Sequence, residues 1–408
     1  MSTPTPHRDA RVLPTTVFIL TQLLILGAAV AAVGYRWTRP ADALTLPELR
    51  DTPLEIRPIY DSPVVVTDEQ LTRVLTRLRP QWDGPQTKIN SIDHALRFWG
   101  VEATFGNRAH PSGEEMRQLL LNQTRFQQLY GKAGEALPLL IPTPPGVRVR
   151  VNEGEMSSSH VDHTAASLAE VGTPLSFPIE TIAGPGTYRQ VVEQVFRDFS
   201  LNQVEYEWST MVFALFAPSP DAWRTKEGQT MTFDRLAERI MRQDQPQGVC
   251  FGNHRLYSLV ILLRVHDQSP ILSAETHAQV VAYLQQMTKQ LVATQHADGC
   301  WNMKWPTEAP ASSSPSEVEG DRLSDRIIAT GHALEWWAMV PEQLAPQLHP
   351  ERDVLVKAGQ WIVRTVDSLE DREIPTHFTF LSHAGRSLAL WRGKFAYEVP
   401  LLESAPQQ

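Results

Sequence analysis

Residues 329–341 read ATGHALEWWAMVP, an apolar stretch that carries a histidine, a glutamate and two tryptophans within about two or three helical turns. Small and aromatic residues fill most of the surrounding segment, 325–340, as is typical of a helix covered on nearly all sides. His332 and Glu335 are three residues apart, so they lie on one face of that helix. The stretch therefore predicts a helical core that encloses ionisable side chains.

Segments of this apolar kind recur six times, and five of them contain a histidine followed closely by leucine. They begin at Ser91, His160, Leu201, Gly252, Asp325 and His377. Amphipathic segments alternate with them and have apolar residues at spacings of three and four: 67–78, 113–130, 187–199, 232–242, 273–295 and 352–369. Strict alternation places the amphipathic helices outside and the apolar helices inside. The pattern predicts an all-α protein, an (α/α)6 toroid of twelve helices, with an open solenoid as the alternative.

Local signals support several of these boundaries. Thr67 with Gln70, and Ser112 with Glu115, match the capping box that begins a helix. The segment 141–151, IPTPPGVRVRV, departs from the helical pattern and predicts a short strand or an extended edge.

Two segments, QHADGCW (295–301) and RPQWDGPQ (79–86), end amphipathic helices with an Asp-Gly turn. Both resemble the Q-x-x-D-G-x-W type of turn found in the squalene-cyclase and prenyltransferase toroids, where Gln and Trp tie adjacent hairpins together. The resemblance supports the fold, and it adds a terpenoid cyclase or prenyltransferase-like function as an alternative. The aspartate-rich D-x-D-D motif of the cyclases is absent from the sequence.

The string GHALEW (331–336) looks like the G-H-x-x-E-W element of the acylglucosamine and cellobiose 2-epimerase family, whose fold is also an (α/α)6 barrel. The resemblance implies that His332 is a catalytic acid/base, that Glu335 supports it, and that Trp336 or its neighbour stacks on a sugar. His383 is the nearest candidate for the second histidine of that family, although its surroundings, LSHAGRSL, do not match.

In a toroid, polar residues on the inner helices either satisfy one another in the core or form the wall of a central cavity. A single buried histidine is more commonly a structural group, but a ring of imidazoles around a cavity is suited to proton transfer. The candidate catalytic residues are His332, Glu335 and His383. The candidate ligand-binding residues are His94, His163, Glu207, Trp208, His254, Tyr257, Trp336 and Arg386.

No metal and no cofactor are expected from the sequence. His160 and His163 form an i,i+3 pair with Asp162 between them, which is a candidate half-site for a metal, but the sequence identifies no third ligand. His383 and Arg386 share a helical face, so they can hold a carboxylate, either of a ligand or of a glutamate in the protein.

Composition excludes some classes of protein. The formal net charge of -9 and the pI near 5.8 argue against nucleic acid as a partner, because such proteins present basic surfaces to phosphates. The two cysteines, Cys250 and Cys300, are too few for a disulfide scaffold; they are either unrelated thiols or one disulfide.

The N-terminal segment 12–35 contains no charge and is long enough, at about 1.5 Å per residue, to cross a hydrocarbon core of roughly 30 Å. It predicts a transmembrane signal-anchor helix, with a cleaved signal peptide as the alternative. The predicted organisation is a short tail (1–11), this helix, a Pro-rich linker (36–66) and the toroid domain (67–400). The protein is accordingly expected to be a single-pass membrane protein with most of the chain extracytoplasmic.

The first functional hypothesis is a membrane-anchored toroid whose His/Glu/Trp-lined cavity binds a carbohydrate-type polar ligand. It would act as an isomerase, hydrolase or lyase by acid-base chemistry. The alternative from another class is a non-catalytic, membrane-tethered scaffold or binding protein whose inner histidines are structural. Terpenoid chemistry is favoured by the tryptophans but lacks its acid motif.

Overall fold

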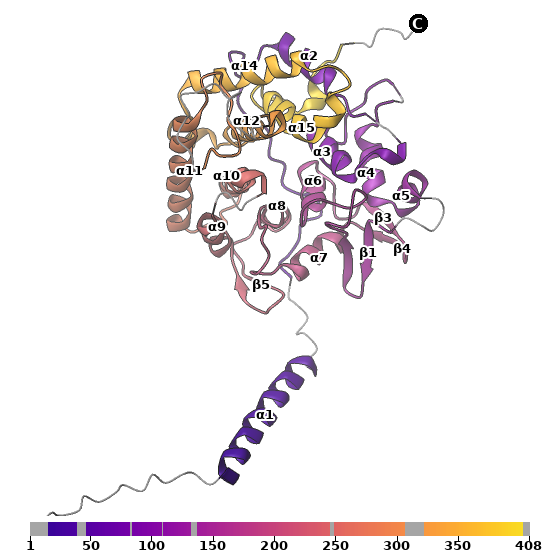
Figure 1. Cartoon of the computed structure of the whole chain (residues 1–408), viewed down its shortest axis with the longest axis vertical. Helices are drawn as coiled ribbons and strands as arrows, with labels where there is room; N and C mark the ends of the chain where they lie inside the picture. Colours follow the sequence, from indigo (N-terminus) through magenta and orange to yellow (C-terminus); the bar gives the residue numbers. More distant parts are fainter. Residues whose placement is uncertain are drawn as a thin grey trace, which may run out of the picture. The chain divides into compact units, whose positions relative to one another are not determined.

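The computed structural model describes residues 15–38, 46–81, 84–107, 109–131, 137–244, 249–306 and 322–402. The chain divides into two compact units, Met1–Thr45 and Leu46–Gln408. The first unit contains helix α1 (Thr15–Thr38), and the second contains the other helices and the strands (Figure 1). The predicted tail (1–11) lies outside the described residues.

The predicted membrane segment requires a correction. Among the described residues, no helix is both long enough and apolar enough to cross a membrane. The predictions of a transmembrane helix over 12–35 and of a single-pass, mostly extracytoplasmic protein are therefore wrong.

The second unit is mostly helical, which confirms the all-α prediction. The predicted apolar segments are α3 (Ile89–Trp99), α6 (His163–Glu170), α8 (Glu207–Phe216), α10 (Asn253–Gln268), α12 (Leu323–Ala338) and α15 (Ile374–Leu390). The predicted amphipathic segments are α2 (Asp68–Arg77), α4 (Gly113–Leu121) with α5 (Gln123–Tyr130), α7 (Arg189–Asp198), α9 (Phe233–Arg242), α11 (Ala274–Thr294) and α14 (Arg352–Ser368). Among the described residues, the short helix α13 (Ala345–Leu348) and the 3-10 turns Gly84–Gln86, Val249–Gly252 and Glu342–Leu344 lie between these helices, and the 3-10 turn Ala396–Glu398 follows α15.

The apolar helices contact one another in a fixed order. Helix α3 contacts α6, α6 contacts α8, α8 contacts α10, α10 contacts α12, α12 contacts α15, and α15 contacts α3. Figure 1 shows these helices nearer the middle of the unit than α7, α9, α11 and α14. Every residue of α8 is buried, whereas α14 buries one face. The difference in burial follows the difference in sequence pattern, since an all-round apolar helix must be covered on all sides.

Helix caps explain where two of the amphipathic helices begin. Both predicted capping boxes are present, Thr67 with Gln70 and Ser112 with Glu115. The predicted helix over 113–130 is divided at Asn122, which adopts an extended conformation and accepts a hydrogen bond from the Arg125 amide. Asparagine competes with the helix in this way because its short side chain can bond to nearby backbone, so α4 ends and α5 begins there.

The turn after α11 ties that helix to α14. The Gln295 side-chain amide donates to the carbonyl oxygens of Gly299 and Val354, each at 2.9 Å. The Trp361 indole donates to Asp298 Oδ2 at 3.2 Å, and the Trp301 indole donates to the Leu291 carbonyl at 2.8 Å. Gln295 of QHADGCW thus connects the end of α11 to α14, whereas Trp301 bonds back to α11 itself. The second turn of this type, 79–86, includes residues 82 and 83, which are not described.

Strands are few and short. The hairpin of β1 (Leu140–Thr143) and β2 (Gly146–Val149) occupies the segment predicted to be extended. Two further antiparallel hairpins were not predicted: β3 (Pro178–Thr181) with β4 (Gly184–Thr187), and β5 (Trp223–Arg224) with β6 (Thr230–Met231). Their strands have only two to four residues, too few for a period-2 pattern to stand out.

The part of the predicted linker that is described, 46–66, lies against the helical unit. The amides of Arg50 and Leu54 donate to the carbonyls of Phe216 and Leu215, each at 2.9 Å. The Ser62 amide donates to the Trp391 carbonyl at 2.8 Å. These backbone hydrogen bonds hold the segment against the end of α8 and the end of α15.

Helices α12 and α15 approach each other very closely at Gly331. A Cβ atom at this position would lie 2.8 Å from the Ala384 nitrogen and 3.1 Å from the His383 carbonyl carbon. Only glycine fits this backbone contact. The close approach brings the next residue, His332, beside His383.

Candidate functional site

Five histidines from five of the apolar helices meet in one place. The distances between ring centroids are 3.9 Å for His332 and His383, 4.2 Å for His254 and His332, 4.5 Å for His94 and His163, and 5.1 Å for His94 and His383. None of the five is more than 5% exposed. We call this group the histidine cluster. The sequence predicted that these imidazoles converge, and they do.

Trp208 of α8 completes the cluster. Its ring centroid lies 4.3 Å from that of His163 and 4.3 Å from that of His254. Its indole nitrogen is buried and has no hydrogen-bond partner among the described residues. This residue, predicted to bind ligand, lies with the histidines.

Glu335 connects the histidines to two arginines. One carboxylate oxygen, Oε2, lies 3.0 Å from His332 Nδ1 and 3.3 Å from His383 Nδ1. The other oxygen, Oε1, lies 2.8 Å from Arg97 Nη1 and accepts a hydrogen bond from Arg386 Nη1. Burial alone would raise the pKa of Glu335, but the two guanidinium groups and the two imidazoles hold it well below its usual value. The carboxylate is therefore ionised.

Glu170, at the end of α6, balances the second positive charge. It accepts hydrogen bonds from Arg97 Nε at 2.5 Å, Arg386 Nη2 at 3.0 Å and the Tyr257 hydroxyl at 2.5 Å. Two arginines and two glutamates thus form a compensated buried network. The carboxylates that His383 and Arg386 hold belong to the protein itself.

His163 has its own carboxylate partner. Its Nδ1 lies 2.9 Å from Asp93 Oδ2, and the Thr164 hydroxyl donates to the same oxygen at 2.6 Å. Burial would raise the pKa of Asp93, but the nearby imidazole and these hydrogen bonds lower it. An ionised Asp93 fixes the ring of His163 in the same way that Glu335 fixes His332 and His383.

The opposite edge of each of these rings is unpartnered. The Nε2 atoms of His163, His332 and His383 are buried and have no hydrogen-bond partner in the described part of the chain, and neither does Nδ1 of His254. Burial lowers the pKa of His254, His332 and His383, so these rings are neutral at pH 7. Among the described residues, Nδ1 of His332 faces only the carboxylate, so Nδ1 carries the proton and Nε2 offers a lone pair. Nδ1 of His383 lies 3.3 Å from Glu335 Oε2 and 3.5 Å from Arg97 Nη1. We assign the His383 proton to Nδ1 as well, because the carboxylate is the nearer partner and can only accept. The cluster can accept a proton or bind a cation.

Some predicted site residues lie elsewhere. Glu207 is buried, but its carboxylate accepts from Arg255 Nε at 3.1 Å and from the Tyr206 amide at 2.7 Å. Trp336 is buried, and its ring contact is with Trp337, at 5.0 Å between centroids. These side chains have structural contacts, while His94, Tyr257 and Arg386 join the cluster and its ion network.

The predicted metal half-site of His160 and His163 does not form. His160 Nδ1 lies 3.2 Å from Glu205 Oε1, whereas His163 Nδ1 faces Asp93. The two ring centroids are 6.0 Å apart. Each ring is held by a different carboxylate, so the pair does not converge on one position.

Sequence reasoning missed three acidic or basic residues of the site: Asp93, Arg97 and Glu170. All three stand in apolar helices that were selected for their histidines. Arg97 is three residues after His94, on the same face, and this spacing was the available signal. Its two partners lie far away in the sequence, so only the folded chain identifies them.

A pocket of about 240 Å³ reaches the ion network from one side. The polar residues Arg97, Glu170 and Arg386 form part of its wall, and Phe98, Phe395 and Tyr397 form an apolar part. A larger pocket of about 570 Å³ lies at the N-terminal ends of α3 and α15, lined by residues such as Asn90, Ser91 and Thr379. The smaller pocket gives a ligand access to groups that also contact Glu335.

Asp162, immediately before α6, is expected to make the free energy of unfolding depend on pH. Burial, with smaller effects of Asp198 and Glu205, raises its pKa from 3.8 to about 7, against the opposing hydrogen bond from the Ser209 hydroxyl. Between pH 4 and pH 7 the native state keeps a proton that the unfolded chain releases, so this group makes stability fall as the pH rises. Asp162→Asn is expected to be more stable than the parent at pH 8 and to lose that advantage at pH 4. Urea unfolding at both pH values measures the difference; an equal difference at both would contradict the raised pKa.

Comparisons with known proteins give no relative on which to base an assignment. The chain matches no family model, no curated protein and no solved structure.

Proposed function

We propose that the apolar helices form the inner ring of an (α/α)6 toroid and that the histidine cluster is an active site for a polar, carbohydrate-type ligand. The ordered contacts from α3 through α15 and back to α3 support the ring. The alternation of apolar and amphipathic helices along the chain supports the division into inner and outer helices.

The observation that carries the proposal is the set of unpartnered Nε2 atoms on His163, His332 and His383. A buried polar atom without a partner costs about 1–3 kcal/mol, so three in one cluster are a large cost to stability. The opposite nitrogen of each ring, Nδ1, contacts a carboxylate, which fixes the orientation of the ring and leaves Nε2 on the other edge. Burial lowers the pKa of His332 and His383, and oriented neutral imidazoles with free lone pairs are suited to general acid-base catalysis.

In the proposed reaction, His383 accepts and returns a proton through Nε2. Glu335 acts as a positioning residue, because it contacts Nδ1 of both His332 and His383 and keeps the lone pairs on the opposite edge. Nε2 of His332, beside His383, provides a second lone pair, which can accept a hydrogen bond from a hydroxyl group of the ligand. The positive charge of the protonated imidazole is stabilised by the same carboxylate.

The chemical character of the surroundings favours a polar ligand. The small pocket is lined by the guanidinium groups of Arg97 and Arg386 and by three glutamates, Glu55, Glu102 and Glu170, which can bond to the hydroxyl and carbonyl groups of a ligand. Its volume, about 240 Å³, is just below the range of about 300–1,000 Å³ for pockets that hold drug-sized ligands, so it suits a small molecule. Trp208 offers an aromatic face within the cluster. A terpenoid could form no hydrogen bond with these charged groups.

The alternative is a non-catalytic scaffold in which the cluster only stabilises the fold. The compensated network of Arg97, Arg386, Glu170 and Glu335 is compatible with this function. The two functions predict different effects of removing a single imidazole: the active site would lose ligand turnover, whereas the scaffold has no turnover to lose.

The test uses the purified chain and a panel of reducing sugars in D2O. Proton transfer next to the sugar carbonyl would replace a carbon-bound hydrogen with deuterium, which NMR detects as loss of the proton signal. We expect His383→Gln to lower the exchange rate by about 100-fold or more while the protein stays folded, because general acid-base catalysis contributes about 10²–10⁴-fold.

His160→Gln is the matched control, because His160 is a half-buried histidine that bonds to Glu205 instead of the network of Glu335. It should leave the exchange rate unchanged. The proposal fails if the parent protein neither binds nor exchanges any sugar of the panel, or if His383→Gln exchanges at the parental rate. Lower stability of His383→Gln without any change in binding or exchange would favour the scaffold.

A further inference from the structure

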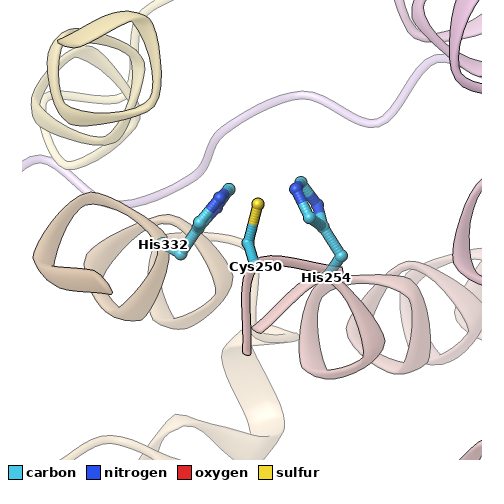
Figure 2. Close-up of side chains that lie close together, drawn as sticks. All are labelled: Cys250, His254 and His332. Carbon is cyan, nitrogen blue, oxygen red and sulfur yellow. The ribbon is translucent and has the colours of Figure 1, made fainter. Parts of the chain in front are cut away.

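Cys250, His254 and His332 bring three metal-ligating atoms together at the histidine cluster. The sulfur and one ring nitrogen of each histidine all lie within 4.8 Å of one another. Figure 2 shows the Cys250 thiol standing between the two imidazoles, with all three side chains directed into the same space. We propose that these three residues bind a divalent transition-metal ion of the zinc class.

The distances suit such an ion after a small closure. Tetrahedral zinc with a sulfur bond of about 2.3 Å and nitrogen bonds of about 2.0 Å places its ligand atoms roughly 3.5 Å apart. The three atoms are already within 4.8 Å, and the ring centroids of His254 and His332 are 4.2 Å apart. Closing the remaining distance of about 1 Å would involve the Cys250 thiol and the His254 ring, because Glu335 holds the ring of His332.

Unpartnered buried atoms provide a second, independent observation. His254 and His332 are each only 2% exposed. Nδ1 of His254 and Nε2 of His332 lack hydrogen-bond partners in the ranges that the structure describes. A metal ion would satisfy both nitrogens, and burial without a partner would otherwise be costly.

The backbone at Cys250 is held in an unusual conformation. Its φ is +49°, in the left-handed region that favours glycine, and it belongs to the 3-10 turn Val249–Gly252 directly before α10. Such a conformation costs about 1 kcal/mol or more and tends to occur where function needs it. Here it places the thiol over the first turn of α10, beside His254. The thiol is free, so the predicted alternative of a disulfide with the second cysteine is not formed.

The surrounding groups orient one ligand and balance the charge. His332 Nδ1 faces Glu335 at 3.0 Å, the carboxylate-histidine arrangement that accompanies metal ligation by the opposite nitrogen. Arg97 and Arg386 would repel a cation, but Glu170 and Glu335 neutralise them. The network therefore adds no net positive charge against which the ion must bind.

A second group, His332, Glu335 and His383, also has ligating atoms within 4.8 Å of one another. Its short distances are those of the hydrogen bonds between Glu335 Oε2 and the two Nδ1 atoms, 3.0 and 3.3 Å. The carboxylate is thus occupied by the imidazoles and by both arginines. We assign the ion to the sulfur-containing group.

Three protein ligands leave a fourth position open, as in zinc sites that act on a ligand. His383 adjoins both histidine ligands, since its ring centroid is 3.9 Å from that of His332 and 5.4 Å from that of His254. The inference that these residues bind a metal ion depends only on geometry. The further idea, that the bound ion polarises an oxygen of a ligand next to His383, rests on the proposed function.

The test is metal binding by the full chain, without any sugar present. Elemental analysis after incubation with zinc and removal of the excess should find about one equivalent per chain. Cobalt substituted for zinc should add a sulfur-to-cobalt charge-transfer band. Cys250→Ser should lose that band. Glu335→Gln should weaken zinc binding by about 10- to 100-fold, as is usual for a group that orients a metal ligand. Cys250→Ser and His254→Gln should weaken it further.

His160→Gln is the control, and it should bind zinc as the parent does, because His160 is paired with Glu205. Circular dichroism checks that each variant is folded; His254→Gln and Cys250→Ser serve as independent probes of the same site. Absence of stoichiometric zinc in the parent overturns the inference, as does zinc binding by both Cys250→Ser and His254→Gln that is as tight as in the parent. If zinc does not bind while His383→Gln still abolishes sugar exchange, the metal site fails and the proposed function survives.

Discussion

Replacing Arg97 by methionine is expected to lower the free energy of unfolding by about 3–5 kcal/mol, because it leaves a buried carboxylate partly uncompensated. Arg97 is 4% exposed, and its guanidinium contacts Glu170 Oε2 at 2.5 Å and Glu335 Oε1 at 2.8 Å. It also stacks over the ring of Tyr257 at 4.9 Å. Methionine fills a similar volume, so the loss reports charge and hydrogen bonding more than packing. Urea unfolding followed by circular dichroism measures it.

Arg73→Met is the matched control for this prediction. Arg73 forms a salt bridge with Asp367 at 2.8 Å, but the two side chains are 44% and 34% exposed. Exposed pairs contribute about 0–1 kcal/mol, so the control should lose little. Arg97→Lys should fall between the two, since an ammonium group keeps the charge but cannot bond to both carboxylates as a planar fork does. Equal losses for Arg97→Met and Arg73→Met would mean that the buried network does not depend on Arg97.

Replacing Trp337 by alanine is expected to cost about 3–5 kcal/mol in the free energy of unfolding. Trp337 is fully buried, its indole donates to the Thr288 hydroxyl at 3.0 Å, and its ring lies 5.7 Å from that of Trp301. These contacts join α12 to α11 and to the turn after it. Trp337 therefore packs between helices, and stacking on a ligand is not required to explain its presence in the sequence.

A second variant at this position, Trp337→Phe, separates the effect on packing from an effect on ligand binding, and Ile182→Ala is the surface control. Trp337→Phe keeps most of the apolar volume and loses the hydrogen bond, so it should cost less than the alanine variant. It should also keep sugar exchange at the parental rate. Ile182→Ala removes an apolar side chain that is 62% exposed and should change stability by less than about 0.5 kcal/mol. A folded Trp337→Phe variant that has lost ligand exchange would place this ring in the binding site.

The helices of the second unit could be predicted from the sequence because their signals are local. Periodic apolar residues, the capping boxes at Thr67 and Ser112, and the Asp-Gly turn at 298–299 each act within a few residues. The same kind of reasoning was wrong for the N-terminal segment as a membrane span, where length and apolarity alone were used. The break at Asn122 was not predicted because a single residue does not interrupt the apolar pattern of the segment. The short hairpins were not predicted because strands of two to four residues are too short to show a period of two.

The candidate site was predictable only in part. A histidine at a matching place on five apolar helices indicated that the imidazoles would meet, and they do so. The partners of those imidazoles were not predictable, because Arg97 and Glu335 are 238 residues apart in the printed sequence and nothing local links them. Glu207 and Trp336 were selected by type and lie in other contacts.

By itself, the sequence determined that this chain builds alternating apolar and amphipathic helices, because helical periodicity depends on neighbours three and four residues away. Only the tertiary structure decided which charges neutralise each other and which nitrogen of each imidazole is left without a partner. Those properties depend on distances between different helices and on the exclusion of water, and both arise when the chain packs.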